Sequence, residues 1–586
     1  MDKYQVANIL EEIAVLLELK GDNPFKVRAF HNGARAIESL SHDLYDLVSK
    51  KKLREIKGIG GHLAQIITDL VLTGRSKDHE ALRKNFPDGV LELLKIPGLG
   101  PKKVKKLYTE LHIKNVRELE YACNENRLLT LEGFGEKTQD KILEGIKHHL
   151  KHQDKHLFPQ GFLDAINLKN ELSSVIPAKA GIQIEIAGSL RRHKELIRDI
   201  DILVSSSSKL SDVMDHFVKL KEVSKVNQKG ETKSSVILHS GIQVDLRCVK
   251  EKEFPYALMY FTGSKEHNTV LRGIAKKKKL KLNEYGLFKG NKNIECKSEE
   301  EIYEKLGLSY IPPELRENMG EIEAAQSSVV PPSRVNLSSR AQRVIPKLVE
   351  EKDIRGVFHN HTTSSDGNAT LEEMVAAAEK LGFEYIGISD HSQSAHYAHG
   401  LKPIDVKKQH QDIDKLQKKF KKITILKGVE SDILNDGSLD YPDSVLASFD
   451  FVIASIHSKF NMPEKEMTHR IVKALKNKYT TMIGHPTGRL ILGRAGYQVD
   501  VKELIHVAAS LGKPVEINAN PHRFDIDWRW WPLLKENKVL VSINPDAHST
   551  AGIADVFYGV GIARKAWMRK EDVLNARSLN EVLKII

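Results

Sequence analysis

Seven short apolar runs in residues 341–586 end at or beside polar side chains that can bind a metal ion, and this pattern constrains the fold more than any other feature. Helical stretches separate the runs, which lie at 357–358, 385–388, 423–429, 451–456, 481–484, 515–517 and 539–543. Short, continuous apolar runs of this kind are typical of buried parallel strands. The carboxyl ends of all strands in a closed βα barrel face one pocket. The sequence therefore predicts a barrel that collects these polar side chains at one end.

Nine of the side chains at these strand ends belong to residue types that bind metal ions. They are His359, His361, Asp366, His391, Glu430, His457, His485, Asp546 and His548. So many nitrogen and oxygen donors favour a cluster of about two to three Mn²⁺, Zn²⁺ or Fe ions over a single structural zinc. Arg523 follows one of the strands and is a candidate to hold a phosphate group, whereas the segment 528–531 is expected to contribute to barrel packing rather than to base stacking.

The composition limits the class of protein. A chain of 586 residues is too long for one hydrophobic core, so several domains are expected. The net charge of +12 comes mostly from residues 1–340, which makes the front part the better candidate for a polyanionic partner. Three cysteines without a Cys-x-x-Cys pair, no signal-like N-terminus and no apolar run of membrane-spanning length predict a soluble cytoplasmic protein.

Residues 1–150 show helical periodicity interrupted by three similar glycine turns. Each turn has the form apolar-x-Gly-apolar-Gly, with glycines at Gly58 and Gly60, Gly98 and Gly100, and Gly133 and Gly135. Glycine permits left-handed backbone, and the free N–H groups at the start of the next helix bind phosphate well. The turns resemble helix-hairpin-helix motifs. They predict DNA-backbone contacts that carry no sequence information, supported by basic residues behind two of the turns: Lys102, Lys103 and Lys137.

A second acidic site is predicted in the middle of the chain, where strand-like runs lie at 182–187, 200–204, 235–238 and 242–247. Asp199 and Asp201 point to one face of a strand because side chains alternate, and Asp245 lies in another strand. Three neighbouring carboxylates repel each other unless cations lie between them. The pattern predicts two Mg²⁺ or Mn²⁺ ions, held in part by substrate phosphates. The backbone of the Gly188-Ser189 turn and the Arg192 guanidinium are expected to bind the phosphate tail.

These residues resemble two known families. The sequence Gly188-Ser189-Leu190-Arg191-Arg192, with Asp199-Ile200-Asp201 and Asp245, resembles the palm of family X DNA polymerases, and the barrel resembles the polymerase and histidinol phosphatase (PHP) family. The resemblance implies gap-filling DNA synthesis in base excision repair and a metal-dependent 3′→5′ exonuclease, with abasic-site endonuclease or 3′-phosphodiesterase activity as a further candidate. It also implies nucleotide- and template-side contacts for the following residues: Tyr260, Phe261, Gly263, Asn268 and Arg272.

The expected fold class is a multidomain α+β and α/β chain. The resemblance implies a helical DNA-binding domain with the first hairpin, a fingers-like helical domain with the second and third hairpins, a nucleotidyltransferase palm, a thumb-like nucleotide-selection domain, a linker and a distorted (βα)7 PHP barrel. In this order the expected bounds are 1–80, 81–155, 156–255, 256–322, 323–340 and 341–586.

Some residues depart from the family pattern. His193 and Arg198 stand where the family often has glycine, and a cationic side chain beside Asp199 is expected to tune metal affinity or to contact template phosphate. Ile66 stands where lyase-active members carry a Schiff-base lysine. An apolar side chain cannot form an imine, so no 5′-deoxyribose-phosphate lyase is expected, with Lys57 and Lys77 as unproven substitutes.

Four other functions remain open. The chain is compatible with a DNA-bound PHP nuclease whose palm is inactive, although the intact aspartate set argues against it. A small-molecule phosphatase conflicts with the fused DNA-binding regions. A non-catalytic DNA end-bridging factor and a template-independent nucleotidyltransferase need experiments to separate them from the main hypothesis. The expected partners are gapped or primed double-stranded DNA and dNTPs, and the expected state is a monomer.

Overall fold

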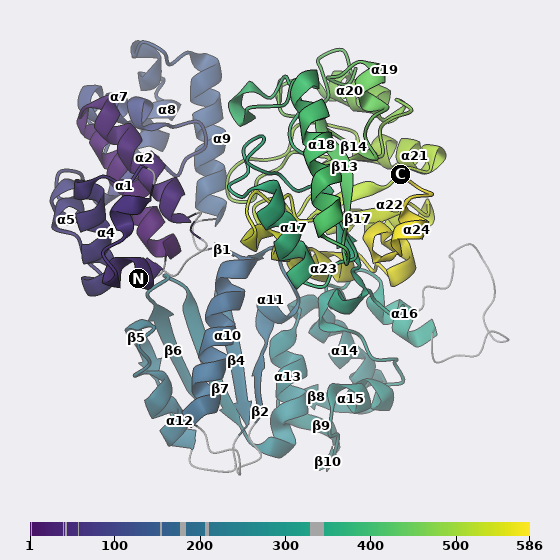
Figure 1. Ribbon diagram of the computed structural model, residues 1–586. Helices are drawn as coiled ribbons and strands as arrows, with labels where there is room; N and C mark the ends of the chain where they lie inside the picture. The colour runs from purple at the N-terminus through teal and green to yellow at the C-terminus, as the bar shows by residue number, and fades with distance from the viewer. Residues whose placement is uncertain are drawn as a thin grey trace. The chain divides into compact units, whose positions relative to one another are not determined.

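The computed structural model describes residues 1, 3–38, 40, 44–56, 58–152, 155–175, 183–205, 210–327 and 345–586. The chain forms two compact units (Figure 1): residues 1–153 with 492–494, and residues 154–491 with 495–586. Residues 328–340 of the expected linker lie outside the described residues, whereas 323–327 belong to helix α16 (Glu321–Ser327).

The first unit is helical, as its periodicity predicts. Apolar residues of the first helix, such as Val6, Leu10 and Ile13, are fully buried against the next helices, and the later helices enclose a second core around Val104 and Leu119. The helices are α1 (Lys3–Lys20), α2 (Pro24–Glu38), α3 (Leu44–Ser49), α4 (Gly61–Thr73), α5 (Lys77–Arg83), α6 (Asp88–Leu93), α7 (Pro101–Glu110), α8 (Val116–Asn124) and α9 (Glu136–His152), with 3₁₀ turns at Leu53–Glu55 and Arg127–Thr130.

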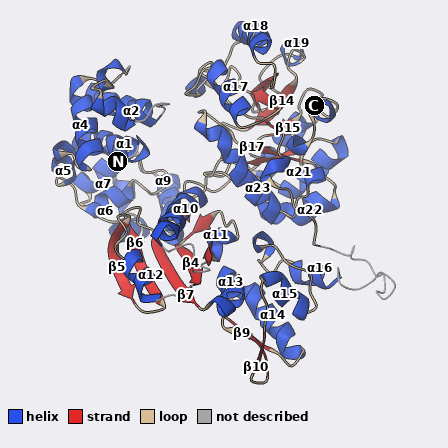
Figure 2. Ribbon diagram, turned by 60° about the horizontal axis from the view of Figure 1, so that its bottom comes forward, coloured by secondary structure: helices blue, strands red, loops and turns tan. Residues whose placement is uncertain are grey.

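The second unit begins with a five-stranded sheet in the order β2-β4-β7-β6-β5, in which only β4 and β7 run parallel. Its strands are β2 (Gln183–Ile186), β4 (Asp199–Ser205), β5 (Val223–Lys229), β6 (Lys233–Leu238) and β7 (Gln243–Val249). The short strand β1 (His156–Leu157) pairs with β3 (Leu196–Ile197), which lies between β2 and β4 in the chain. Ile200, Ile202 and Val204 form the apolar face of β4 and share a core with α10 (Phe158–Val175) and α12 (Leu210–Phe217) (Figure 2). The opposite face of β4 is therefore left for Asp199 and Asp201.

A small α+β layer follows this sheet. It contains α13 (Phe254–Thr262), α14 (Lys265–Lys277), α15 (Glu299–Lys305), α16 and a three-stranded antiparallel sheet of β8 (Lys281–Asn283), β9 (Gly286–Lys289) and β10 (Lys292–Ile294). Buried polar pairs stabilise it. The fully buried Arg316 donates to Glu299 at 2.6 Å, and His267 lies between Glu321 (2.7 Å) and Tyr303 (2.9 Å).

The predicted barrel is confirmed: each of the seven apolar runs supplies one strand, and the strands pair in sequence order, all parallel. The bridge between Asn360 and Ala547 brings the first and last strands together and nearly closes the barrel. Gly428 leaves room for the Phe451 ring, since a Cβ there would lie 2.1 Å from it. The strands are β11 (Gly356–Val357), β12 (Tyr385–Ile388), β13 (Thr424–Asp432), β14 (Phe451–Ser455), β15 (Met482–Ile483), β16 (Val515–Asn518) and β17 (Val541–Asn544).

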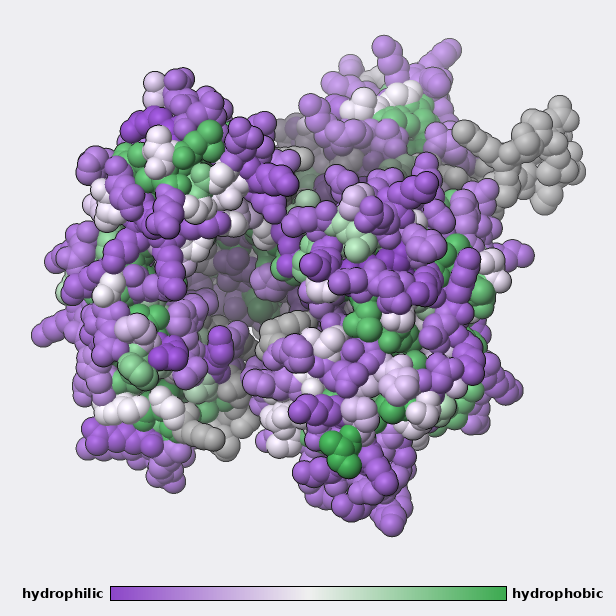
Figure 3. Space-filling model, turned by 90° about the horizontal axis from the view of Figure 1, so that it is seen from above, coloured by the Kyte–Doolittle hydropathy of each residue, from purple (hydrophilic) through white to green (hydrophobic). Residues whose placement is uncertain are grey.

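Helices between the strands and after the last strand cover the barrel, as in other parallel βα architectures. They are α17 (Leu371–Lys380), α18 (Pro403–Lys419), α19 (Asp443–Leu446), α20 (Glu464–Leu475), α21 (Val501–Leu511), α22 (Trp531–Glu536), α23 (Val556–Lys565) and α24 (Leu579–Val582). Among the described residues, no helix is long and apolar enough to cross a membrane. The face drawn in Figure 3 is mostly hydrophilic, with hydrophobic residues in small scattered groups.

His193, which stands where the family often has glycine, is a packing residue in this structure. Its ring stacks on Phe158 at 4.9 Å between centroids, and a Cβ at Gly561 of α23 would lie 2.0 Å from its Nδ1 atom. Burial lowers the pKa of His193 to about 4. The side chain is therefore neutral near pH 7 and packs against α23. Arg198 is exposed beside Asp199, and its charge, like that of Lys233, opposes the rise in the pKa of Asp199 that burial and Asp245 cause.

Candidate functional site

The structure brings the three predicted aspartates together on one sheet face. Asp201 on β4 lies directly opposite Asp245 on the parallel strand β7, and Asp199 precedes Asp201 on the same face. Burial, followed by repulsion from the other two carboxylates, raises the pKa of Asp201 to about 7, and burial and Asp245 also raise the pKa of Asp199. This buried group of carboxylates fits hard divalent cations, which would remove the repulsion.

Asp245 differs from the other two carboxylates because neighbouring donors stabilise its charge. Lys233 Nζ lies 2.8 Å from one carboxylate oxygen, and Ser235 Oγ and Gln243 Nε2 donate to the other at 2.7 and 3.1 Å. Burial opposes ionisation, but these contacts outweigh it and lower the pKa of Asp245. Asp245 is therefore the aspartate that stays ionised most readily.

The Gly188-Ser189 turn lies against the aspartates. Gly188 has φ +64°, and a Cβ there would meet the Oδ2 atom of Asp201 at 2.2 Å, so only glycine fits this close approach. The turn opens the short helix α11 (Gly188–Arg191). A backbone hydrogen bond holds the turn beside the aspartates: Ala187 N–H donates to the Asp201 carbonyl at 2.8 Å. The predicted phosphate-binding backbone therefore lies next to the predicted metal ligands.

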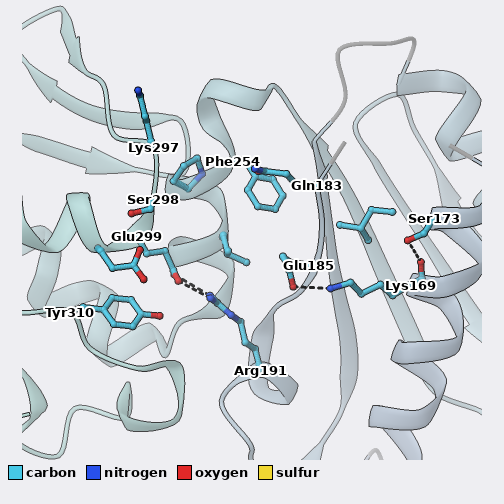
Figure 4. Close-up of a pocket in the computed structure, with 14 residues that line it drawn as sticks. Lys169, Ser173, Gln183, Glu185, Arg191, Phe254, Lys297, Ser298, Glu299 and Tyr310 are labelled. Carbon is cyan, nitrogen blue, oxygen red and sulfur yellow. Dashed lines mark hydrogen bonds and ion pairs between the residues drawn. The ribbon is translucent and has the colours of Figure 1, made fainter. Parts of the chain in front are cut away.

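Both arginines that follow the turn reach the α13–α15 layer. Arg191 forms a bidentate pair with Glu299 (2.7 and 3.0 Å) at one wall of a cavity of about 760 Å³ (Figure 4), whose lining does not include the three aspartates. Arg192 donates through Nε to Glu317 at 3.1 Å and through Nη1 to the Thr262 carbonyl. Arg192, the predicted triphosphate ligand, therefore has a carboxylate partner in this structure.

The predicted sugar-facing residues lie at the end of α13. The half-buried rings of Tyr260 and Phe261 meet edge to face at 5.2 Å, and the Arg247 guanidinium lies 4.4 Å from the Phe261 ring. Asn268 is buried and donates to the Tyr260 carbonyl at 2.7 Å. Arg272 is exposed on α14, where it is accessible to a nucleic acid.

The barrel brings all nine predicted ligands into one cluster around Glu430. The Glu430 carboxylate lies 2.9 Å from His485 Nε2 and 3.1 Å from both His359 Nε2 and His391 Nδ1, with His457 Nε2 at 3.3 Å. The four other residues extend the cluster through contacts of 3.5–3.8 Å that join His361, Asp366, Asp546 and His548. Most ligands are buried, whereas His548 (36% exposed) and Asp366 (28%) form the accessible side.

The donor set fits metal ions. Within the described part of the chain, Nε2 of His359, both ring nitrogens of His361 and Nδ1 of His485 are buried without a hydrogen-bond partner. Leaving buried polar atoms unpaired is costly, and coordination of cations would satisfy them. Despite burial, the neighbouring histidines hold the pKa of Glu430 well below its usual range, so this central ligand is an anion.

Two buried carboxylates that the sequence analysis missed orient the histidines. Glu516 Oε1 lies 2.6 Å from Nδ1 of His359, and its second oxygen accepts from the His485 backbone at 2.5 Å. Asp432 contacts Nδ1 of His457 at 2.6 Å. Such contacts fix the ring orientation of metal-binding histidines. Glu516 could have been found from the sequence, because it is a charged residue inside the apolar run Val515-Glu516-Ile517.

Arg523 and Trp528 have distinct roles in the barrel. Arg523 Nε lies 3.2 Å from Asp546 Oδ2, so its guanidinium borders the metal cluster. Trp528 is 3% exposed and donates through Nε1 to Glu195 at 2.9 Å, and Trp531 stacks on Trp567 at 4.5 Å. This segment is packed, as expected.

The three glycine turns of the first unit share one geometry. Gly58, Gly98 and Gly133 have φ of +93°, +87° and +88°, and in each turn the next residue donates from its backbone N–H to the carbonyl three positions earlier, at 3.0–3.1 Å. The helices α4, α7 and α9 start just after these turns. Lys102 and Lys137 are exposed, whereas Lys103 Nζ donates to the Gly98 carbonyl at 3.2 Å.

No amine occupies the position at which a lyase lysine was considered. Ile66 is 2% exposed in the core of α4, and Lys77 begins α5. Lys57 lies outside the described residues.

The architecture defines a class: a nucleotidyltransferase-like sheet joined to a helical unit with helix-hairpin-helix turns and to a metal-binding parallel barrel. Family models match the helical unit, the layer after the sheet and the barrel. The Helix-hairpin-helix domain matches residues 1–76, the SAM-like Helix-hairpin-helix tandem 90–148, the DNA polymerase beta thumb 257–317 and the PHP domain 358–520.

The sequence is 40% identical to the DNA polymerase/3′-5′ exonuclease PolX of Bacillus subtilis (strain 168), over 99% of both chains. This chain therefore belongs to the PolX family, the bacterial family X DNA polymerases with a C-terminal PHP domain.

Other relatives match one part each. A probable phosphatase of Thermoanaerobacter sp. (strain X514) is 30% identical over 37% of this chain and 88% of its own length. The repair DNA polymerase X of African swine fever virus is 34% identical over 22% of this chain and 78% of its own. The crystal structure of Leishmania infantum polymerase beta in a ternary P/T complex covers 39% of this chain and 98% of that chain, with 25% identity and a TM-score of 0.26.

Proposed function

We propose that this protein fills short gaps in DNA during base excision repair and trims 3′ ends with its barrel. The observation that carries the proposal is the coexistence of Asp199, Asp201 and Asp245 on one sheet face with a separate nine-residue cluster in the barrel. Its substrates are gapped or primed double-stranded DNA and dNTPs. It works as a monomer in the cytoplasm, where its three buried free cysteines suit a reducing environment.

The polymerase site uses each residue for one task. Divalent cations, Mg²⁺ or Mn²⁺, held by the three aspartates supply charge stabilisation as the primer 3′-oxygen replaces pyrophosphate at the α-phosphorus. The Gly188-Ser189 backbone and Arg192 hold the β- and γ-phosphates. Tyr260, Phe261 and Gly263 line the sugar, and Asn268 and Arg272 contact the nucleotide and the template side.

The barrel site holds about two to three Mn²⁺, Zn²⁺ or Fe ions through its nine ligands, and these ions supply Lewis acidity at the scissile phosphodiester. Glu516 and Asp432 fix the rings of His359 and His457. Arg523 orients the phosphate from the edge of the cluster. Abasic-site endonuclease and 3′-phosphodiesterase activities would use the same cluster.

The six expected domain bounds are retained as part of this proposal. The thumb match at 257–317 and the PHP match at 358–520 support separate regions from about residues 256 and 341. The compact first unit supports grouping the three hairpins before the palm.

The polymerase assignment is tested with Asp201→Asn on a one-nucleotide gap. The exchange removes a buried carboxylate with little change in volume, so incorporation is expected to fall to background while trimming continues. Asp215→Asn, which changes a half-exposed aspartate paired with Lys229, is the matched control. Undiminished incorporation by Asp201→Asn would refute the assignment.

The barrel assignment is tested by replacing His359 and His361 together with alanine. Trimming of the 3′ end is expected to disappear and extension to remain. His469→Ala, on the exposed side of α20, is the control. Retained trimming by the double variant would place the nuclease elsewhere.

A further inference from the structure

Glu317 lies where the palm turn (residues 188–194) meets the barrel. Its carboxylate receives Arg192 Nε at 3.1 Å, Lys565 Nζ at 2.7 Å and Lys194 Nζ at 3.4 Å. Arg192 and Lys194 belong to the palm turn, whereas Lys565 is the last residue of the barrel helix α23. One carboxylate therefore faces three cations, and despite burial they hold the pKa of Glu317 at about 2.

Lys565 is completely buried and does not belong to the metal-binding cluster of the barrel. Its ammonium group also donates to the backbone carbonyls of Arg192 (3.0 Å) and Glu314 (3.2 Å) and lies 4.6 Å from the Trp528 ring. A fully buried lysine is costly unless charge and hydrogen-bond partners compensate. Here all of its hydrogen-bond partners lie in the palm turn and the segment around Glu317, outside the barrel.

Glu317 and a bound nucleotide would compete for Arg192. A guanidinium that binds Glu317 competes with the same guanidinium binding a triphosphate, because both partners are oxyanions. A buried carboxylate with only one cationic partner would hold that partner strongly. Lys565 and Lys194 supply alternative cations to Glu317, so Arg192 can exchange Glu317 for a nucleotide without leaving a buried charge uncompensated.

We propose that Lys565 is a positioning residue for the polymerase reaction: the PHP barrel uses it to neutralise Glu317 and thereby makes Arg192 available to the incoming dNTP. This inference rests on the proposed nucleotide role of Arg192. It makes the barrel part of the nucleotide-binding site, beyond its own metal chemistry.

The test measures gap filling by the full chain as a function of dNTP concentration. Lys565→Met is expected to raise the KM for dNTP by about tenfold while kcat stays within about twofold, since the loss concerns nucleotide binding. Glu317→Gln is expected to lower KM by about threefold, and the double variant is expected to return KM towards the wild-type value.

A merely structural role of Lys565 predicts a different result. Arg564→Met removes a neighbouring ion pair of the same helix, Arg564 with Glu314 at 2.7 Å, and is expected to leave KM unchanged. An unchanged KM in Lys565→Met, or a double variant with a KM as high as Lys565→Met, would overturn the inference. If Lys565→Met does not fold, as judged by thermal unfolding, Glu317→Gln alone decides, and a KM that is not lowered overturns the inference.

Arg192→Ala separates this inference from the proposed function. If Arg192→Ala leaves KM unchanged, the nucleotide role of Arg192 fails, and the inference fails with it. If Arg192→Ala raises KM but Lys565→Met does not, only the inference fails. Trimming of single-stranded DNA by each variant reports whether the barrel is intact.

Discussion

At the residue scale, the two metal centres differ in the chemistry of their donors. The palm offers three carboxylates, and burial followed by their mutual repulsion raises the pKa of Asp199 and Asp201, an arrangement that suits hard cations. The barrel mixes imidazoles with carboxylates, so anionic Glu430 lies among nitrogen donors that suit transition metals. Lys233 beside Asp245, together with Arg198 and Arg247, opposes these shifts but does not cancel them for Asp199 and Asp201.

The palm pKa values lead to a pH dependence. A proton and a cation compete for the carboxylate of Asp201, whose pKa is about 7, so the proton wins more often as the pH falls. The Mg²⁺ concentration for half-maximal incorporation is expected to rise about tenfold per pH unit below about pH 7 and to level off above about pH 8. Single-turnover incorporation at several pH values measures it. An equal Mg²⁺ requirement across this range would contradict the expectation.

Glu516→Gln tests how the barrel orients its ligands. The exchange keeps the shape but removes the charge that supports His359 through a 2.6 Å contact. Metal affinity and trimming are expected to fall by about tenfold to hundredfold, the usual effect of losing such a partner. Calorimetric titration of metal-free protein with Mn²⁺ gives the affinity, and Glu503→Gln, exposed on α21, is the control. Equal affinities in the two variants would mean that Glu516 does not support the ligands.

At the element scale, the sequence predicted those strands whose burial requires a run of apolar residues. The seven barrel strands and the strands β2, β4, β6 and β7 were predicted because their apolar runs are buried, although their ends shift by up to three residues. β5 (Val223–Lys229) was missed because it is an exposed edge strand with a polar sequence, and the two-residue strands β1 and β3 are too short for any pattern.

Contacts between elements that are far apart in the chain could not be predicted from such patterns. The nine barrel ligands were predictable because six of the seven strands end at or beside at least one of them, whereas the partners Glu516 and Asp432 depend on which ring lies opposite them. Lys565 appears in sequence as an ordinary basic residue at a helix C-terminus. Its role emerges only from the packing of α23 against the palm turn.

The glycine turns allow a prediction for one element, the start of α7. Lys102 is exposed next to the Gly98 turn, where helix N–H groups and a cation both favour phosphate. Lys102→Ala is expected to reduce the slope of log binding constant against log salt by about one. Fluorescence anisotropy with labelled gapped DNA measures this slope. Lys114→Ala, exposed beyond the other end of α7, is expected to leave it unchanged, and equal slopes for wild type and both variants would contradict a phosphate contact.

At the scale of the whole molecule, the barrel is joined to the palm by more than chain connectivity. Trp528 and Arg529 contact Glu195, Lys565 contacts the Arg192 carbonyl, and His193 packs on α23. The sequence predicted both activities and their ligands but gave no sign of this interface. Because the same turn carries the predicted phosphate-binding residues and the barrel contacts, synthesis and trimming share a structural element.

The most direct test of the account uses a 5′-labelled primer with a mismatched 3′ end on a one-nucleotide gap, with dNTPs and Mg²⁺ plus Mn²⁺. The wild type is expected to remove the mismatch and then extend. The His359→Ala, His361→Ala variant is expected to extend only a matched primer, and Asp201→Asn only to shorten either primer. Loss of both reactions in either variant, despite normal folding, would contradict the claim of two separate active sites on one chain.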